Sequence, residues 1–285
     1  MKTISNKINK GIVFGGCSFT WGQGLYYYSN LETLKEPPPD AYDVKLVTDA
    51  HKRAGAVLRY PRLVANYFNT FEVCMLQNGG SEETTFVYLK RIFDLVKGHE
   101  HLFNEALSFN EIEYIILQTS QPNRNSFTFV YDGTQYDFRT YSPETRYVFF
   151  KWLDQEKLEF DDWYSRHVRN IFNQLKETLA FYESKGIKTL FLNWEDEYLP
   201  LVKEDTYMLD RFIPLEYKGK TYECIRHLMN ENKHLTINSD YEHFEIPPTD
   251  HHPSKECHQV MAANVIKKIE DNINNENEIY GKKLI

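Results

Sequence analysis

Residues 11–24 read GIVFGGCSFTWGQG, a short apolar segment followed at once by a glycine-flanked turn that carries Ser18. The apolar residues predict a buried strand over 11–14. Glycines around the serine allow a tight turn and a close approach of the backbone to a substrate oxygen. A serine hydroxyl becomes a nucleophile only with a base in hydrogen-bond reach. The run therefore predicts either a nucleophilic serine or a structural strand-to-helix turn. A phosphate-binding loop is disfavoured, because no lysine follows and G-x-G-x-x-G is absent.

The same strand–helix alternation continues along the chain. Strands are expected over 71–76, 113–119 and 187–192, and helices over 61–68, 165–185 and from Lys255 onwards. A further helix with Ser81 as its N-cap has a predicted apolar face of Phe86, Leu89, Phe93 and Val96. This order predicts one three-layer α/β/α domain over residues 1–285, with a central parallel sheet of the flavodoxin-like type. Sites in such sheets lie at the carboxyl ends of the strands.

Three segments are expected to be insertions at that edge. Residues 26–58 contain three consecutive prolines, and residues 195–248 are expected to be irregular. Residues 126–142 alternate aromatic and polar positions around Asp132-Gly133, which predicts a β-hairpin. Insertions at this edge usually shape access to the site.

Composition excludes several classes of protein. The chain has 285 residues, 41% of them hydrophobic, and a net charge of −8. A nucleic-acid partner would need a basic face, and no apolar run is long enough for a membrane span. The N-terminus lacks the pattern of a signal peptide, so the cytoplasm is the expected compartment. The four cysteines have no C-x-x-C spacing, which favours free, mostly buried thiols.

A candidate acid and base lie near the other end of the chain, in Asp250-His251-His252-Pro253-Ser254. Serine early with Asp and His late is one chain order in which a hydrolytic triad is assembled. A metal site formed by His251, His252 and His258 is not expected, because their spacing differs from the i, i+4 pair of zinc hydrolases. His258 is expected to pack near the last helix and His251 to be exposed.

Three blocks in this order resemble the SGNH/GDSL hydrolases. Gly16-Cys17-Ser18-Phe19-Thr20-Trp21-Gly22 is similar to their Gly-Asp-Ser-Leu-Thr-x-Gly block. Asn78-Gly79-Gly80-Ser81 is similar to their second block, and residues 250–258 are similar to their Asp-x-x-His-Pro block. The blocks span most of the strand–helix frame and leave the insertions unexplained.

The resemblance implies Ser18 as nucleophile, His252 as general base and Asp250 as the acid that orients it. It also implies an oxyanion hole from the N–H groups of Ser18 and Gly80, with Gly79 as the fallback. Family members add an Asn side chain from a third block, Gly-x-Asn-Asp. Losing one such donor costs about 3–4 kcal/mol of transition-state stabilisation.

The sequence departs from the family at two places. The third block is replaced by residues 118–124, QTSQPNR, where Gln121 stands in the place of the Asn and Asn123 is a second candidate. Arg124 could hold an anionic group of the substrate, and each of these residues could equally belong to a plain polar loop. Asp250 precedes His252 by two residues rather than three, so Asp240 or Glu245 could be the acid instead. Cys17 is a minor alternative to Ser18 as nucleophile.

These observations predict a serine esterase that needs no cofactor and no metal. The resemblance makes an O-acetyl or short acyl ester on a carbohydrate the leading substrate, with lipid or thioester second. The alternative is a non-enzymatic glycan-binding or structural protein, associated with a phage virion, on a degenerate hydrolase scaffold. The expected partner is a small-molecule or glycan ester rather than a nucleic acid or a membrane.

Overall fold

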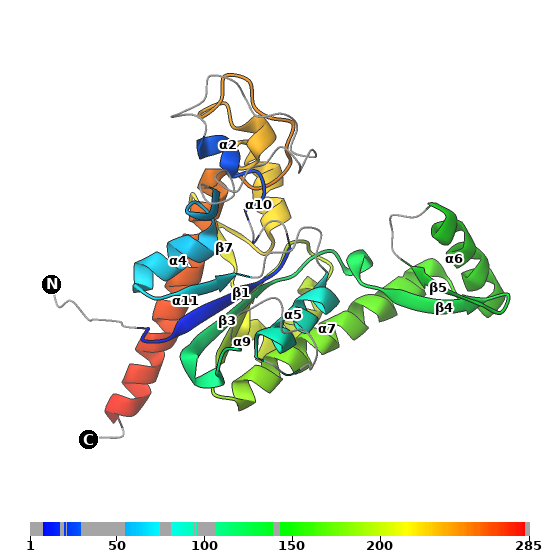
Figure 1. Ribbon diagram of the computed structural model, residues 1–285, viewed down its shortest axis with the longest axis horizontal. Helices are drawn as coiled ribbons and strands as arrows, with labels where there is room; N and C mark the ends of the chain where they lie inside the picture. The colour runs from blue at the N-terminus through cyan, green and yellow to red at the C-terminus, as the bar shows by residue number, and fades with distance from the viewer. Residues whose placement is uncertain are drawn as a thin grey trace.

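The computed structural model describes residues 8–17, 20, 22–29, 55–74, 81–93, 95, 106–138 and 143–282. Its centre is a parallel sheet with the strand order β2-β1-β3-β6 (Figure 1). The strands are β1 (Gly11–Gly15), β2 (Glu72–Cys74), β3 (Ile112–Gln118) and β6 (Lys188–Leu192). This is the flavodoxin-like order, and a parallel bridge between Phe191 and Phe212 extends the sheet beyond β6.

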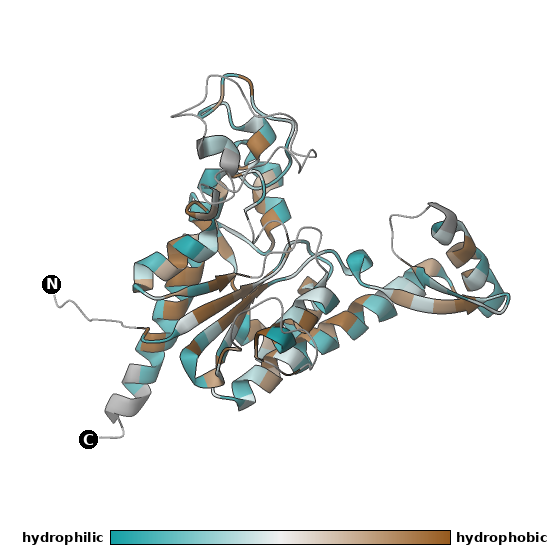
Figure 2. Ribbon diagram, in the orientation of Figure 1, coloured by the Kyte–Doolittle hydropathy of each residue, from teal (hydrophilic) through white to brown (hydrophobic). Residues whose placement is uncertain are grey.

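Helices cover both faces of the sheet, which confirms the predicted three layers. On one face lie α4 (Tyr60–Phe68) and α11 (Lys255–Lys282), and on the other α5 (Glu82–Ile92) and α7 (Phe160–Ser184). Successive residues of β1 divide between the two: Ile12 and Phe14 pack toward α4 and α11, and Val13 toward α5 and α7. Strands buried on both faces are apolar throughout, and Figure 2 shows the sheet as a brown layer between half-teal helices.

Local sequence signals account for the helix boundaries. Pro61 lies in the first turn of α4, where its missing N–H costs nothing. Ser81 caps α5 as expected, with its hydroxyl accepting from the Thr84 N–H at 3.3 Å. Gly186, at φ 82°, follows the end of α7. The helix expected over 165–185 is present as α7 but begins at Phe160, and its apolar residues are buried: Val168, Ile171, Phe172, Leu175, Leu179 and Tyr182.

The predicted hairpin is present and belongs to a larger arm. Strands β4 (Phe127–Tyr131) and β5 (Thr134–Phe138) are joined by Asp132 and Gly133, both at positive φ as a type I′ turn requires. Helix α6 (Pro143–Glu156), which the sequence did not suggest, packs against the hairpin. With the first turns of α7 they enclose a separate aromatic core, and the arm projects from the body (Figure 1).

The expectation of an irregular segment over 195–248 was wrong. This segment forms α8 (Leu199–Glu204), α9 (Thr206–Arg211), β7 (Leu215–Tyr217), β8 (Lys220–Tyr222), α10 (Ile225–Glu231) and the 3-10 turns η4 (Lys233–Leu235) and η5 (Ile237–Ser239). Each element is too short for its periodicity to appear in the sequence. Fully buried side chains such as Met208 and Leu228 tie them to the two main cores.

The remaining short elements are α2 (Tyr26–Ser29), η2 (Phe109–Glu111) and η3 (Pro122–Arg124). Most of the expected insertion over 26–58 lies outside the described residues. The four cysteines are free, and all except Cys74 are buried, as predicted. Within the described ranges, no helix has the length and apolar character that crossing a membrane requires.

Candidate active site

Asp250 and His252 meet in the loop that precedes α11. Nδ1 of His252 lies 2.6 Å from Oδ1 of Asp250, and the main-chain N–H of His252 donates to the same oxygen at 2.9 Å. One carboxylate oxygen thus accepts from both the ring and the backbone of a residue two positions away, so the shortened spacing still permits contact. Of the other two acid candidates, Asp240 accepts from the Tyr28 hydroxyl at 2.6 Å, and Glu245 is exposed.

Both side chains of the pair are largely buried, and the carboxylate of Asp250 selects one tautomer of the His252 ring. The Asp250 side chain is 2% exposed and that of His252 18%. A carboxylate only accepts, so Nδ1 of His252 carries the proton and Nε2 is left as the basic nitrogen. Oδ2 of Asp250 is buried and has no hydrogen-bond partner within the described part of the chain.

The segment η4–η5 holds this loop in place. The N–H of Asn238 donates to the Asp250 carbonyl at 2.8 Å, and the N–H of Ile237 donates to the His252 carbonyl at 3.0 Å. An antiparallel bridge pairs Thr236 with Pro253. The main chain on both sides of the acid and base is therefore fixed by hydrogen bonds.

The turn after β1 packs directly against the acid. A Cβ on Gly24, whose φ is 84°, would lie 2.7 Å from Oδ2 of Asp250 and 2.5 Å from Cδ1 of Ile237. Only glycine fits there, because a side chain would meet the carboxylate and the backbone is left-handed. The segment that follows Ser18 thus reaches the segment that carries Asp250.

Ser18 itself lies outside the described residues, as do Gly79 and Gly80, so their predicted roles stay predictions. Cys17 and Thr20, on either side of residues 18 and 19, are described. Thr20 Oγ1 donates to Gln118 Oε1 at 3.0 Å, and Gln118 Nε2 contacts Cys17 Sγ at 3.4 Å. These contacts tie the turn to the carboxyl end of β3. Cys17 is fully buried in the core, which leaves it poorly placed to attack a substrate.

His258 is fully buried in the first turn of α11, six residues after His252. The Tyr60 N–H donates to His258 Nδ1 at 3.2 Å, and the two rings stack. Burial, together with the charges of His252 and Arg59, lowers the pKa of His258 to about 3, so its ring is neutral. His258 packs in the first turn of α11 and His251 is exposed, both as predicted. Among the described residues, no group of three His, Cys, Asp or Glu side chains is arranged to hold a metal ion.

The loop after β3 is fastened by a buried carboxylate that sequence reasoning missed. Glu82 is 4% exposed. It accepts from the Ser120 N–H at 2.8 Å, the Ser120 hydroxyl at 2.9 Å, Asn125 Nδ2 at 2.7 Å and the Tyr198 hydroxyl at 3.1 Å. We call these four residues the Glu82 clasp. It joins the start of α5, which follows Gly80, to the loop that carries Gln121. An acidic residue in the first turn of a helix is favoured by the helix dipole, so the sequence alone carries no signal for the clasp.

The third-block candidates lie on η3 (Asn123 and Arg124) and at the residue before it (Gln121). The side-chain amide of Gln121 donates to Glu195 Oε1, so in this structure it is engaged by a carboxylate. Asn123 and Arg124 are half-buried beside it. On the far side of η3, His167 Nε2 contacts the Pro122 carbonyl at 3.2 Å, which anchors the turn to α7.

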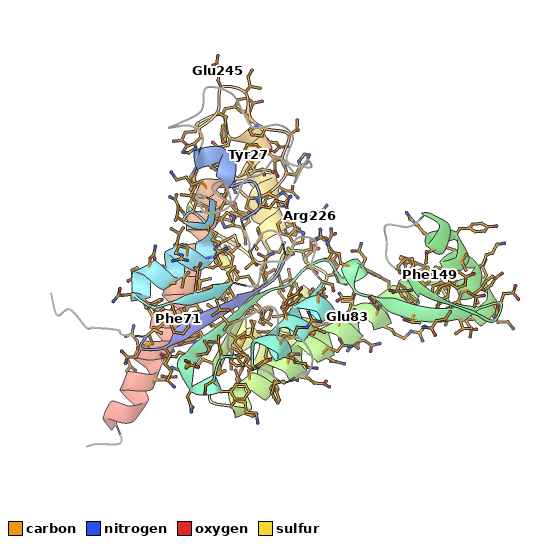
Figure 3. All side chains as sticks on the ribbon, viewed as in Figure 1. Tyr27, Phe71, Glu83, Phe149, Arg226 and Glu245 are labelled. Carbon is orange, nitrogen blue, oxygen red and sulfur yellow. The ribbon has the colours of Figure 1, made fainter. Side chains whose placement is uncertain are left out.

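Acidic residues follow the end of β6. Glu195 also accepts from Arg226 Nη1 at 2.5 Å. Burial, together with the negative charge of Glu195, raises the pKa of Glu197 to about 7. This cluster, the Glu82 clasp and η3 thus meet at the carboxyl edge of the sheet, where Figure 3 labels Arg226.

A cavity of about 570 Å³ opens at the same edge. Its walls include Gln121, Arg124, Glu195 and Arg226, together with Asn238 and His251 from the segments around the acid and base. Two other cavities lie elsewhere, one between α5 and α7 and one at the amino end of β6. Of these three cavities, only the one of about 570 Å³ is lined by residues next to Asp250 and His252.

No model of a known protein family matches the chain, and no curated protein sequence does. Solved structures with a similar course of the chain include an acetyl xylan esterase from the rumen bacterium Butyrivibrio proteoclasticus, 14% identical with a TM-score of 0.47. The match covers 93% of this chain and 64% of that one. A family 2 carbohydrate esterase with a carbohydrate-binding domain from Corynascus thermopiles (Myceliophthora fergusii) is 11% identical, with a TM-score of 0.47 and coverage of 94% and 68%. A lipolytic protein of the G-D-S-L family from Desulfitobacterium hafniense is 10% identical, with a TM-score of 0.38 and coverage of 91% and 99%.

Proposed function

We propose that this protein is a serine-dependent hydrolase of short acyl esters, foremost O-acetyl groups on carbohydrate. The observation that carries the proposal is the Asp250–His252 pair, with Nδ1 and Oδ1 at 2.6 Å, at the carboxyl edge of the sheet. Gly24, six residues after Ser18 in the chain, packs against Asp250 of this pair. The carbohydrate substrate rests on the resemblance of the three sequence blocks to SGNH/GDSL hydrolases.

In the proposed mechanism, Ser18 Oγ attacks the ester carbonyl while His252 Nε2 takes its proton. The tetrahedral intermediate collapses, the alcohol leaves with the proton from His252, and the acyl group stays on Ser18. Water then attacks this acyl-enzyme with His252 again as base, which releases the acid and restores the serine. Asp250 keeps the proton on Nδ1 and stabilises the imidazolium form of His252.

The proposed oxyanion hole consists of the N–H groups of Ser18 and Gly80, with Gly79 as the alternative to Gly80. Asn123 and Gln121 are the candidates for a side-chain donor. Gln121 would have to exchange its bond to Glu195 for one to the oxyanion when substrate binds. The Glu82 clasp supports this arrangement, because it joins the start of α5, which follows Gly80 in the chain, to the loop that carries Gln121.

A fluorophosphonate probe tests the proposal, since an activated serine hydroxyl attacks its phosphorus and displaces fluoride. We expect one adduct in the folded protein, which mass spectrometry places on Ser18, and turnover of a short-chain aryl ester that Ser18→Ala abolishes. Cys17→Ala is the matched control at the neighbouring position and should keep both labelling and turnover. Absence of the adduct on Ser18 would favour the alternative of a binding protein on a degenerate scaffold.

A further inference from the structure

The cavity beside the Asp250–His252 pair shares its wall with the proposed catalytic loop. His251, which lines the cavity, stands between the acid and the base in the chain. Asn238 lines it as well, and its N–H donates to the Asp250 carbonyl. A group bound in this cavity would therefore lie next to the ester that His252 serves.

The charges around the cavity are mostly positive. Arg124 on η3, Arg226 on α10 and Lys233 on η4 all line it, so three different elements each contribute one cation. In contrast, the chain as a whole has 41 acidic and 33 basic residues. A local excess of positive charge in an acidic protein favours an anionic ligand, because enclosing walls focus the field.

The one carboxylate in the cavity wall, that of Glu195, already has hydrogen-bond donors of its own. Glu195 accepts from Gln121 and from Arg226. Neither Arg124 nor Lys233 has an ion pair within the described residues, and the Arg124 Nε is buried without a partner there. The Arg226 side chain is 51% exposed and can reach a ligand from its position beside Glu195.

Trp194 adds an aromatic surface to the same cavity. Ligand sites combine such apolar walls with a few polar groups that fix the orientation of the ligand. Cationic side chains together with an aromatic wall suit a sugar ring that carries a negative group, since guanidinium groups match the geometry of carboxylates and similar oxyanions.

We propose that this cavity binds the anionic group, a carboxylate or a sulfate, of an acidic acetylated glycan and thereby presents the neighbouring ester to the Asp250–His252 pair. This inference rests on the proposed esterase function and narrows its substrate from glycan esters in general to those of acidic glycans.

Binding measured without turnover tests it. Titration calorimetry on the Ser18→Ala variant compares three galactose-based oligosaccharides of equal length: neutral, carboxylated at C6, and sulfated. We expect the carboxylated or the sulfated one to bind at least about tenfold more tightly than the neutral one, and the tighter of the two identifies the anion. Added salt should weaken that binding.

Charge-removing variants locate the binding site. Arg124→Gln and Lys233→Gln should each weaken binding of the acidic oligosaccharide by about tenfold, the range of one charge-assisted hydrogen bond. Lys10→Gln removes the same charge at the opposite edge of the sheet, where β1 begins, and should have no effect. Thermal melting shows that each variant is folded.

The inference is overturned if the neutral and acidic oligosaccharides bind equally, if none binds, or if Lys10→Gln weakens binding as much as Arg124→Gln does. Turnover of an aryl acetate by the wild-type protein separates this failure from that of the proposed function. An active enzyme without a preference for acidic glycans contradicts only the anion site, whereas an inactive protein contradicts the esterase.

Discussion

At the scale of single residues, the carboxylate of Asp250 accepts from His252 twice, through its ring and through its main chain. The backbone bond fixes the position of Oδ1, so the ring nitrogen meets a preplaced acceptor. With this geometry, an acid two residues before the histidine can contact the ring, as the acid three residues before it would in the SGNH/GDSL hydrolases. We therefore assign Asp250 rather than Glu245 as the acid of the proposed mechanism.

Asp250→Asn should therefore lower kcat for an aryl ester by about 10³- to 10⁴-fold, because the amide can donate to Nδ1 and stabilise the wrong tautomer. Steady-state kinetics measures the loss. Glu245→Gln, at the exposed acid that the sequence also allowed, is the control and should keep wild-type kcat. A similar loss in both variants would contradict the assignment.

A second prediction for a single residue concerns His258 and the pH dependence of the free energy of unfolding. Its pKa is lowered to about 3 by burial and by the charges of His252 and Arg59, whereas the unfolded value is about 6.5. The unfolded state therefore binds more protons between these values, so stability is present above pH 6.5 and declines as the pH falls toward 3. The slope is about 1.4 kcal/mol per pH unit once the unfolded histidine is protonated.

His258→Asn should remove this contribution, because Asn retains an acceptor for the Tyr60 N–H and does not titrate. Urea unfolding between pH 4 and 8 compares the two proteins. We expect the wild-type protein to lose stability relative to the variant as the pH falls. Parallel curves would show that His258 does not carry the effect.

At the scale of elements, the Glu82 clasp joins α5 to the loop after β3. Glu82→Gln leaves one acceptor oxygen and places an NH₂ group against donors. We expect a loss of about 2–4 kcal/mol in the free energy of unfolding, because buried donors lose a charged acceptor. Tyr198→Phe removes a single bond and should cost about 1–2 kcal/mol. Chemical denaturation measures both, and equal costs would argue against the clasp.

The main elements were predictable because each has a local signature. Buried strands read as apolar runs, and α7 and α11 have enough turns for a visible stripe. Helix α6 was missed because its buried Phe149 and Leu153 face the hairpin, and its other face carries exposed aromatic residues such as Tyr147. The small elements of 195–248 were missed because their helices have only six or seven residues and their strands three, too few for a repeating pattern to show.

Some contacts of the candidate site could be predicted from the sequence and others could not. Asp250 and His252 were predictable, since they are neighbours in a recognisable block. Glu82, Asn125 and Glu195 were not, because their partners are distant in the chain and only the parallel sheet brings them to one edge. The engagement of Gln121 by Glu195 is of this kind.

At the scale of the whole molecule, the arm and the body have separate cores that share one helix. Phe149 is fully buried in the arm, away from Arg226 (Figure 3), and its ring contacts those of Phe138 and Trp163. The later turns of α7 bury their apolar residues against the sheet.

Phe149→Ala should therefore destabilise the arm by about 3–5 kcal/mol, the usual cost of such a cavity, and leave the body folded. Hydrogen exchange followed by mass spectrometry should show lost protection over β4, β5 and α6 with unchanged protection in β1 and β3. Exchange that rises equally in the sheet would show that arm and body unfold as one unit.

The two-residue separation of Asp250 and His252 also has a consequence for how the protein assembles. Closing so short a loop costs almost no chain entropy, whereas Gly24, near the other end of the chain, reaches Asp250 only after the long-range parallel pairing of β1, which forms slowly. During refolding, the contact between Asp250 and His252 is therefore available early, and we expect recovery of the proposed esterase activity to follow the later docking of β1 against α11.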